Sequence, residues 1–386
     1  MLHYQAPRWL KGPGSLGGNV QTIWPALYSH PRADQAGEAV SYQRERWDTP
    51  DGDFIDVDWL RASGAPGDDR PLLVLFHGLE GSSQSHYARA FAHWAQAQGW
   101  DYVVPHFRGC SGEMNRTVRA YHSGDHEELD WVLRRLALRH TGPMLAVGVS
   151  LGGNALLRWA QEAGSQAGSV VKAVVAISSP VDLTAAGQAL GRGFNRHVYT
   201  RMFLRTLKPK ALAKARAHPG VVKVDALLAA RDLYEYDNAY TAPVHGFAST
   251  EDYWLRASAK PGLRAMRHVP ALVLNARNDP FVPAESLPRP HEVGPAVTLV
   301  MSAFRKAVFR GMWPICRVRW AAGSRNICED RHGRHRQSCD QEMAQCAVLL
   351  WLAGAGCARR LVSARRCGAG RRAVSANQGQ PHPARE

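Results

Sequence analysis

Along the first 300 residues, short apolar runs alternate with longer stretches in which apolar residues recur at helical spacing. The strand-like runs lie at 71–76, 102–105, 144–148, 173–177, 270–275 and 296–300, and the helix-like stretches at 86–98, 125–138 and 154–162. Residues 40–60 alternate around an Asp51-Gly52 turn, which predicts an early hairpin. Strands that alternate with helices predict an α/β fold with a mostly parallel central sheet flanked by helices.

Two segments depart from this alternation. The pattern of residues 182–266 predicts helices and irregular segments, inserted between two strands. An insertion at that place can form a lid over a site at the strand ends. Residues 301–386 show no sustained period of either kind. We therefore expect a domain over 1–300 with a helical lid insertion at about 182–266, followed by a disordered basic tail at 301–386.

The charge of the chain is distributed unevenly. The net charge is +15, but residues 302–386 hold 16 Lys and Arg against 5 Asp and Glu. Cysteine divides in the same way, because Cys110 stands alone in the first 301 residues while the other six lie beyond them. A single cysteine in the body, with no signal peptide and no transmembrane span evident, predicts a cytoplasmic protein.

The segment Gly148-Val149-Ser150-Leu151-Gly152 carries the clearest chemical signal. It follows a predicted strand and precedes a predicted helix, which is the context of a nucleophile elbow. Glycines are needed on both sides of the serine because the turn is tight. A chance match in a glycine-rich chain is the alternative, and the flanking strand and helix make it the weaker one.

Two further segments fit the same chemistry. His77-Gly78-Leu79-Glu80-Gly81 follows the first apolar strand, so the backbone amides of Leu79 and Leu151 are candidates for an oxyanion hole. We expect His77 to hold this loop by hydrogen bonds rather than to act as the base. Asp279 follows the strand at 270–275 and comes after the serine, where the acid of a Ser, Asp, His order belongs. An ordinary turn aspartate before Pro280 is the alternative for it.

These motifs resemble one family. The segments GGNVQTIWPAL, TPDGDFIDVDW, FHGLEGSS, HFRGCSGEMNR, GVSLGGN, YDNAYTAPVHGF and NARNDPFVP, over about residues 5–300, resemble the YheT-like α/β-hydrolases, relatives of the abhydrolase-domain esterases and lipases. The resemblance implies hydrolysis of short-chain, medium-chain or lipid carboxylic esters, with Ser150 as nucleophile and Asp279 as acid. No metal or cofactor is expected.

The family places its histidine in a Gly-Gly-His-Val-Gly type loop soon after the last strand. Here no histidine lies between His291, which precedes that strand, and His332, which with His335 falls in the arginine-rich tail. The codons of Gly311-Met312-Trp313-Pro314, read one base back, can spell Gly-His-Val-Ala together with the last base of the preceding codon. We therefore hypothesise a frameshift after about residue 301.

We consider three alternative functions for this sequence. The first is an active serine esterase acting on a small-molecule or lipid ester, with a transient contact to a membrane surface. The second is a catalytically impaired member of the family that has lost its histidine. The third is a hydrolase domain fused to a nucleic-acid or zinc module, which ranks last because the tail has no C-x2-C pair and no aromatic platform. The oligomeric state stays open.

Overall fold

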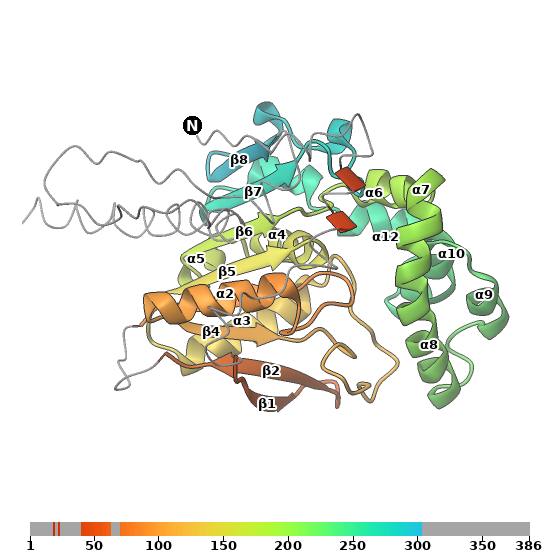
Figure 1. Cartoon of the computed structure of the whole chain (residues 1–386), viewed down its shortest axis with the longest axis horizontal. Coiled ribbons are helices and arrows are strands. Elements are labelled where there is room, and N and C mark those ends of the chain that lie inside the picture. Colours follow the sequence, from red (N-terminus) through yellow and green to blue (C-terminus); the bar gives the residue numbers. More distant parts are fainter. Residues whose placement is uncertain (1–17, 20–21, 24–39, 63–69, 303–386) are drawn as a thin grey trace, which may run out of the picture.

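The computed structural model describes residues 18–19, 22–23, 40–62 and 70–302. Its centre is an eight-stranded sheet in the order β1-β2-β4-β3-β5-β6-β7-β8 (Figure 1). The strands are β1 (Gln43–Asp48), β2 (Phe54–Leu60), β3 (Leu72–Phe76), β4 (Asp101–Pro105), β5 (Met144–Val149), β6 (Ala173–Ile177), β7 (Ala271–Ala276) and β8 (Val297–Ser302).

The sheet is parallel except at one edge. β1 pairs with β2 and β2 with β4 in antiparallel register, whereas β3 to β8 pair in parallel. The hairpin, the six later strands and the α/β fold expected from the sequence are thus confirmed. β8 continues to Ser302, two residues past the end expected for that strand; the rest of the predicted tail lies outside the described residues.

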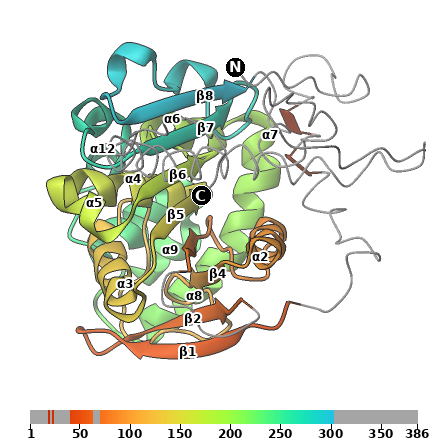
Figure 2. The ribbon, with the colours of Figure 1, turned by 90° about the vertical axis from the view of Figure 1, so that its left-hand side faces the viewer.

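Alternate residues of the parallel strands face two separate cores. Leu73 and Leu75 pack with Phe91 of α2 (His86–Gln98), while Val74 and Phe76 pack with residues of α3 (His126–Arg139) and α4 (Leu151–Ala163). Figure 2 shows α2 on one side of the sheet and α3, α4 and α5 (Ala167–Val170) on the other. Continuous apolar strands are expected for a sheet that is covered in this way.

A helical insertion separates β6 from β7. It contains α6 (Leu183–Leu190), α7 (Gly193–Asn195), the π-helical turn η3 (Arg196–Thr200), α8 (Arg201–Ala217), α9 (Val224–Ala229), α10 (Leu233–Tyr236), the π-helical turn η4 (Asp237–Thr241), α11 (Ala242–Val244), α12 (Thr250–Ala257) and the 3₁₀ turn η5 (Lys260–Ala265). Several of these helices stand at one end of the strands (Figure 1). The insertion has a small apolar core of its own, in which Leu207 and Tyr240 are buried.

None of the helices among the described residues combines the length and apolar character needed to cross a bilayer.

Candidate active site

The candidate residues gather at one edge of the sheet because parallel strands end on the same side. Ser150 follows β5, His77 follows β3, Ser178 follows β6, and the loop containing Asp279 follows β7. Ser150, Ser178 and Phe281, which follow β5, β6 and β7, line a single pocket together with Leu79 from the loop after β3. The fold therefore brings together segments that are 200 residues apart in the sequence.

Ser150 occupies a strained turn between β5 and α4. Its φ of 54° and ψ of −119° lie in a region that residues with a side chain rarely adopt, and its N–H donates to the Ile177 oxygen at 2.8 Å. The turn needs glycine on both sides: a Cβ at Gly148 would lie 2.4 Å from the Gly152 oxygen, and one at Gly152 would lie 2.5 Å from the Phe76 oxygen. This packing fixes the position of Ser150 in the lining of the pocket.

Two backbone amides flank Ser150. Leu79 and Leu151 both line its pocket, and neither amide has a hydrogen-bond partner among the described residues. Leu151 opens α4, so the positive end of the helix dipole also lies there. The loop of Leu79 approaches the serine closely, because a Cβ at Gly78 would lie 3.2 Å from the Ser150 Cβ. The arrangement can accept a developing negative charge.

His77 is a structural residue of the same loop. It is fully buried, and its Nε2 accepts the Phe107 N–H at 3.1 Å while its Nδ1 lies 2.8 Å from the Gly78 oxygen. Nδ1 therefore carries the proton and donates it. Burial lowers the pKa of His77 to about 3, so the ring stays neutral. The expectation that His77 holds the loop is confirmed.

Asp279 lies immediately beyond β7 and is 5% exposed. Its Oδ1 accepts the N–H of Phe281 at 2.9 Å, and Phe281 and Val282 line the pocket. Asp279 itself is not a lining residue, so it stands behind the wall of the site rather than in it. An acid that orients an imidazole occupies such a place.

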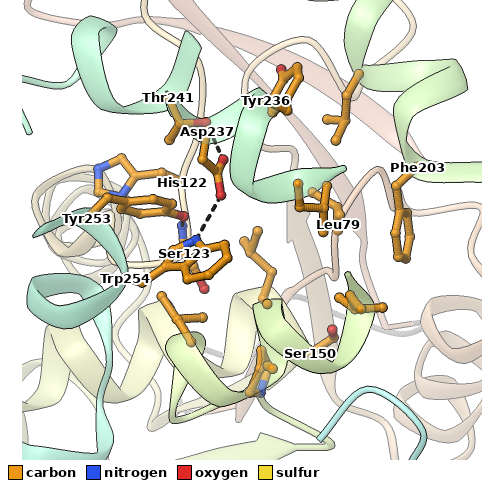
Figure 3. A pocket seen from close by; sticks show the side chains of 18 of the residues that line it. Leu79, His122, Ser123, Ser150, Phe203, Tyr236, Asp237, Thr241, Tyr253 and Trp254 are labelled. Atoms are coloured by element: carbon orange, nitrogen blue, oxygen red, sulfur yellow. Dashed lines mark hydrogen bonds between the residues drawn. The ribbon is translucent and has the colours of Figure 1, made fainter. Parts of the chain in front are cut away.

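The pocket is mostly apolar and extends from Ser150 into the helical insertion (Figure 3). Its walls come from α6, α8, α10, η4 and α12 of the insertion together with the loops of the sheet edge. The apolar lining includes Leu79, Leu151, Leu183, Leu190, Phe203, Leu207, Tyr236, Tyr240, Trp254 and Phe281. Such a lining suits an acyl chain.

One carboxyl group interrupts this apolar lining. Asp237 accepts the Thr241 hydroxyl at 2.7 Å and the Trp254 indole N–H at 2.8 Å, and Figure 3 shows this group apart from Ser150. Removal of the carboxylate from water raises the pKa of Asp237 to about 6. Asp237 was not among the predicted site residues, although it lies within the YDNAYTAPVHGF segment.

Asp237→Asn is expected to relieve a pH-dependent loss of stability. The folded protein holds the Asp237 proton up to about pH 6, whereas the unfolded chain releases it near the ordinary pKa of 3.8. The folded state thus binds more protons between these values, and its stability falls as the pH rises through them. Thermal unfolding of both proteins should show that the stability of the variant, relative to that of the parent, increases from about pH 4 to about pH 6. A difference in stability that does not change with pH would contradict this.

Glu80 anchors the loop that carries Leu79. It has a positive φ of 55°, its N–H donates to the Tyr121 hydroxyl at 2.9 Å, and that hydroxyl donates back to its carboxylate at 2.8 Å. Lys210 of α8 forms an ion pair with the same carboxylate at 2.7 Å. The insertion is therefore joined to the candidate oxyanion loop by a direct contact that sequence analysis did not predict.

Tyr121→Phe is expected to destabilise the protein by about 1–3 kcal/mol, because it leaves the Glu80 N–H and carboxylate without their shared partner. Urea unfolding measures the change. Tyr234→Phe is the matched control, since its hydroxyl bonds Glu251 at an exposed position, and we expect it to cost less than about 1 kcal/mol. Equal effects of the two variants would refute the role of the Tyr121 hydroxyl in anchoring the Glu80 loop.

No described histidine bonds to Ser150. His122 is the histidine among the described pocket-lining residues, and it accepts the Gly124 N–H and packs edge-on against His245. Burial lowers the pKa of His122 to about 3. His291 is exposed and precedes β8, as expected, whereas His332 and His335 lie outside the described residues.

Asp125 and Glu128, at the start of α3, and Asp53, before β2, have a structural role. Arg108 binds Glu128 at 2.5 Å and Asp53 at 3.0 Å, and Arg119 binds Asp125 at 2.5 Å. These buried carboxylates are thus paired with guanidinium groups. Among residues 40–62 and 70–302, no group of three or more His, Cys, Asp or Glu side chains is placed to hold a metal ion.

Comparison with known proteins gives one consistent result. A family model described as the alpha/beta hydrolase fold matches residues 71–302. YheT of Escherichia coli, named an esterase, is 42% identical over 283 residues, which cover 72% of this chain and 80% of that protein. Phospholipase ABHD3 of Mus musculus is 30% identical over 285 residues, covering 71% and 68%.

Solved structures are more distant. The esterase Pf2001 of Pyrococcus furiosus aligns with a TM-score of 0.42 and 19% identity, covering 68% of this chain and 82% of that one. The sheet order, the strained serine turn, the family model and the identity to YheT agree. The chain belongs to the YheT-like α/β-hydrolase family, whose named relatives here are ester hydrolases.

Proposed function

We propose that this protein is a serine hydrolase of carboxylic esters, with Ser150 as nucleophile, Asp279 as the acid, and the amides of Leu79 and Leu151 as the oxyanion hole. The observation that carries the proposal is the strained Ser150 turn, which faces an apolar pocket between two unpartnered amides. Names of relatives as esterase and phospholipase support the ester bond as the target.

The chemistry follows from these positions. A histidine would take the proton of Ser150 as its oxygen attacks the ester carbonyl, and Asp279 would hold the imidazole in the required tautomer. The tetrahedral oxyanion would receive hydrogen bonds from Leu79 and Leu151, the alcohol would leave, and water would release the acid from the acyl-enzyme. The apolar lining would hold the acyl chain, and the helical insertion at about 182–266 would act as its lid.

A second candidate is a member of the family impaired by loss of its histidine to a C-terminal frameshift. It is favoured by the absence of any histidine bonded to Ser150 among the described residues and by the lack of histidine between His291 and His332. We call the version read one base back after about residue 301 the frame-restored chain. Resequencing the gene tests this candidate, and a verified, unbroken frame would refute it.

Asp279→Asn in the frame-restored chain tests the assignment of the acid. The amide keeps the shape of the side chain but favours the wrong imidazole tautomer, so kcat for a p-nitrophenyl ester should fall about 10⁴-fold. Asp225→Asn, on the exposed side of α9, is the control and should leave kcat unchanged. A loss of less than tenfold at Asp279 would refute its role.

The partners follow from the reaction. We propose a small-molecule or lipid ester as substrate, a transient contact with a membrane surface and no nucleic acid. A cytoplasmic location is proposed on the single cysteine, Cys110, among the first 301 residues.

A further inference from the structure

The helical insertion carries a row of apolar side chains on its outer surface. Phe194, Val198 and Met202 are 51%, 37% and 52% exposed, and they follow one another at four-residue spacing through α7, η3 and α8. Residues four apart lie on one face of a helix. Single exposed apolar residues are common, but an aligned row on one helical run points to a binding surface.

A row of cations runs beside it. His197, Arg201 and Arg205 are exposed at the same spacing, and Arg201 and Arg205 form no ion pair with the described residues. No acidic residue occurs between 183 and 224, a segment that holds 9 Lys and Arg. The two rows together, Phe194, Val198 and Met202 with His197, Arg201 and Arg205, are called the basic helix face below.

The other side of the same helical run faces the candidate active site. Phe203 lines the pocket, the Tyr199 ring packs against Phe281 at 4.5 Å, and the Asn195 amide donates to the Pro280 oxygen at 2.6 Å. The helical run that carries the basic helix face therefore contacts the pocket and the loop of Asp279 with its opposite side. Figure 1 shows α7 and α8 at the outer end of the molecule.

We propose that the basic helix face docks on the surface of an anionic lipid bilayer. The apolar row enters the boundary between headgroups and acyl chains, while Arg201 and Arg205 bind the negative headgroups. Charge complementarity favours this occupant over a second copy of the chain, because two such faces would repel each other. The inference rests on the proposed function, since docking would bring a lipid ester to the pocket, and it names the surface involved.

Vesicle sedimentation tests the proposal without any reaction, using the full chain with Ser150→Ala. We expect binding to vesicles of phosphatidylcholine with phosphatidylserine and weak binding to phosphatidylcholine alone. Arg201→Glu with Arg205→Glu should weaken binding at least tenfold, since each surface arginine adds to the attraction for anionic headgroups and each glutamate opposes it. Phe194→Ser with Met202→Ser should also weaken it, by about tenfold or more.

Matched variants at other positions test whether vesicle binding depends on this face or on surface charge and exposed apolar residues in general. Arg264→Glu with Arg267→Glu makes the same change of charge, and Leu138→Ser with Leu255→Ser removes apolar residues that are 89% and 67% exposed. Both pairs should retain parental binding. Equal loss in the controls, binding indifferent to phosphatidylserine, or a dimer that only the face variants dissociate would overturn the proposal. Ester hydrolysis by the frame-restored chain, measured separately, reports on the proposed function alone.

Discussion

The frame-restored chain is expected to hydrolyse p-nitrophenyl butyrate at least about 10⁴-fold faster than the chain as it stands. The reason is the proton of Ser150: without a base beside it, the hydroxyl is a weak nucleophile, and binding with the oxyanion hole supplies only residual catalysis. Codons 311–314, read one base back, can supply a histidine about ten residues after β8. Because β8 pairs in parallel with β7, whose end leads to Asp279, we expect this histidine to reach the same edge of the sheet. The measurement is kcat for the two purified proteins.

Ser150→Ala in both chains provides the control for this comparison. It should abolish the rate of the frame-restored chain and leave the low rate of the other nearly unchanged, because members of a triad act as one unit. Equal and Ser150-dependent rates in the two parents would contradict the loss of the base. They would mean that a histidine outside the described residues, such as His332 or His335, reaches the serine.

Gly152→Ala is expected to lower the thermal unfolding temperature by about 6 °C or more, from a loss of about 3 kcal/mol. The added Cβ would lie 2.5 Å from the backbone oxygens of both Phe76 and His77, so α4 and β3 would have to move apart. That movement would also separate Ser150 from the loop of Leu79. Differential scanning calorimetry measures the change.

Gly191→Ala serves as the matched glycine control. Its nearest neighbour would be the Gly187 oxygen at 3.4 Å, an ordinary contact, and its φ of −74° suits any residue. We expect a change of less than about 1 kcal/mol, in either direction. If Gly152→Ala were as well tolerated as Gly191→Ala, the close packing of the serine turn would be wrong.

The sheet was predictable because its strands are buried on both faces. Runs such as 71–76 and 173–177 are continuously apolar and are separated by amphipathic stretches, so their type and order could be read directly. The predicted helix at 86–98 agrees with α2 at both ends. The Ser150 turn was equally accessible, because its glycines, strand and helix are all local in sequence.

Other features depend on contacts that sequence does not display. α4 begins at Leu151, three residues before the expected start, because Gly152 and Gly153 are weak helix formers that close packing nevertheless requires. The ion pair of Lys210 with Glu80 joins residues 130 positions apart, and nothing near either residue signals it. The polar group at Asp237 likewise arises only when η4 and α12 come together.

The central claim is that Ser150 is the nucleophile, and labelling with a fluorophosphonate probe followed by peptide mass spectrometry tests it most directly. In the frame-restored chain the account predicts one adduct, on Ser150, that disappears in Ser150→Ala and slows in Asp279→Asn. An adduct on another residue, or a folded frame-restored protein in which Ser150 stays unmodified, would contradict it.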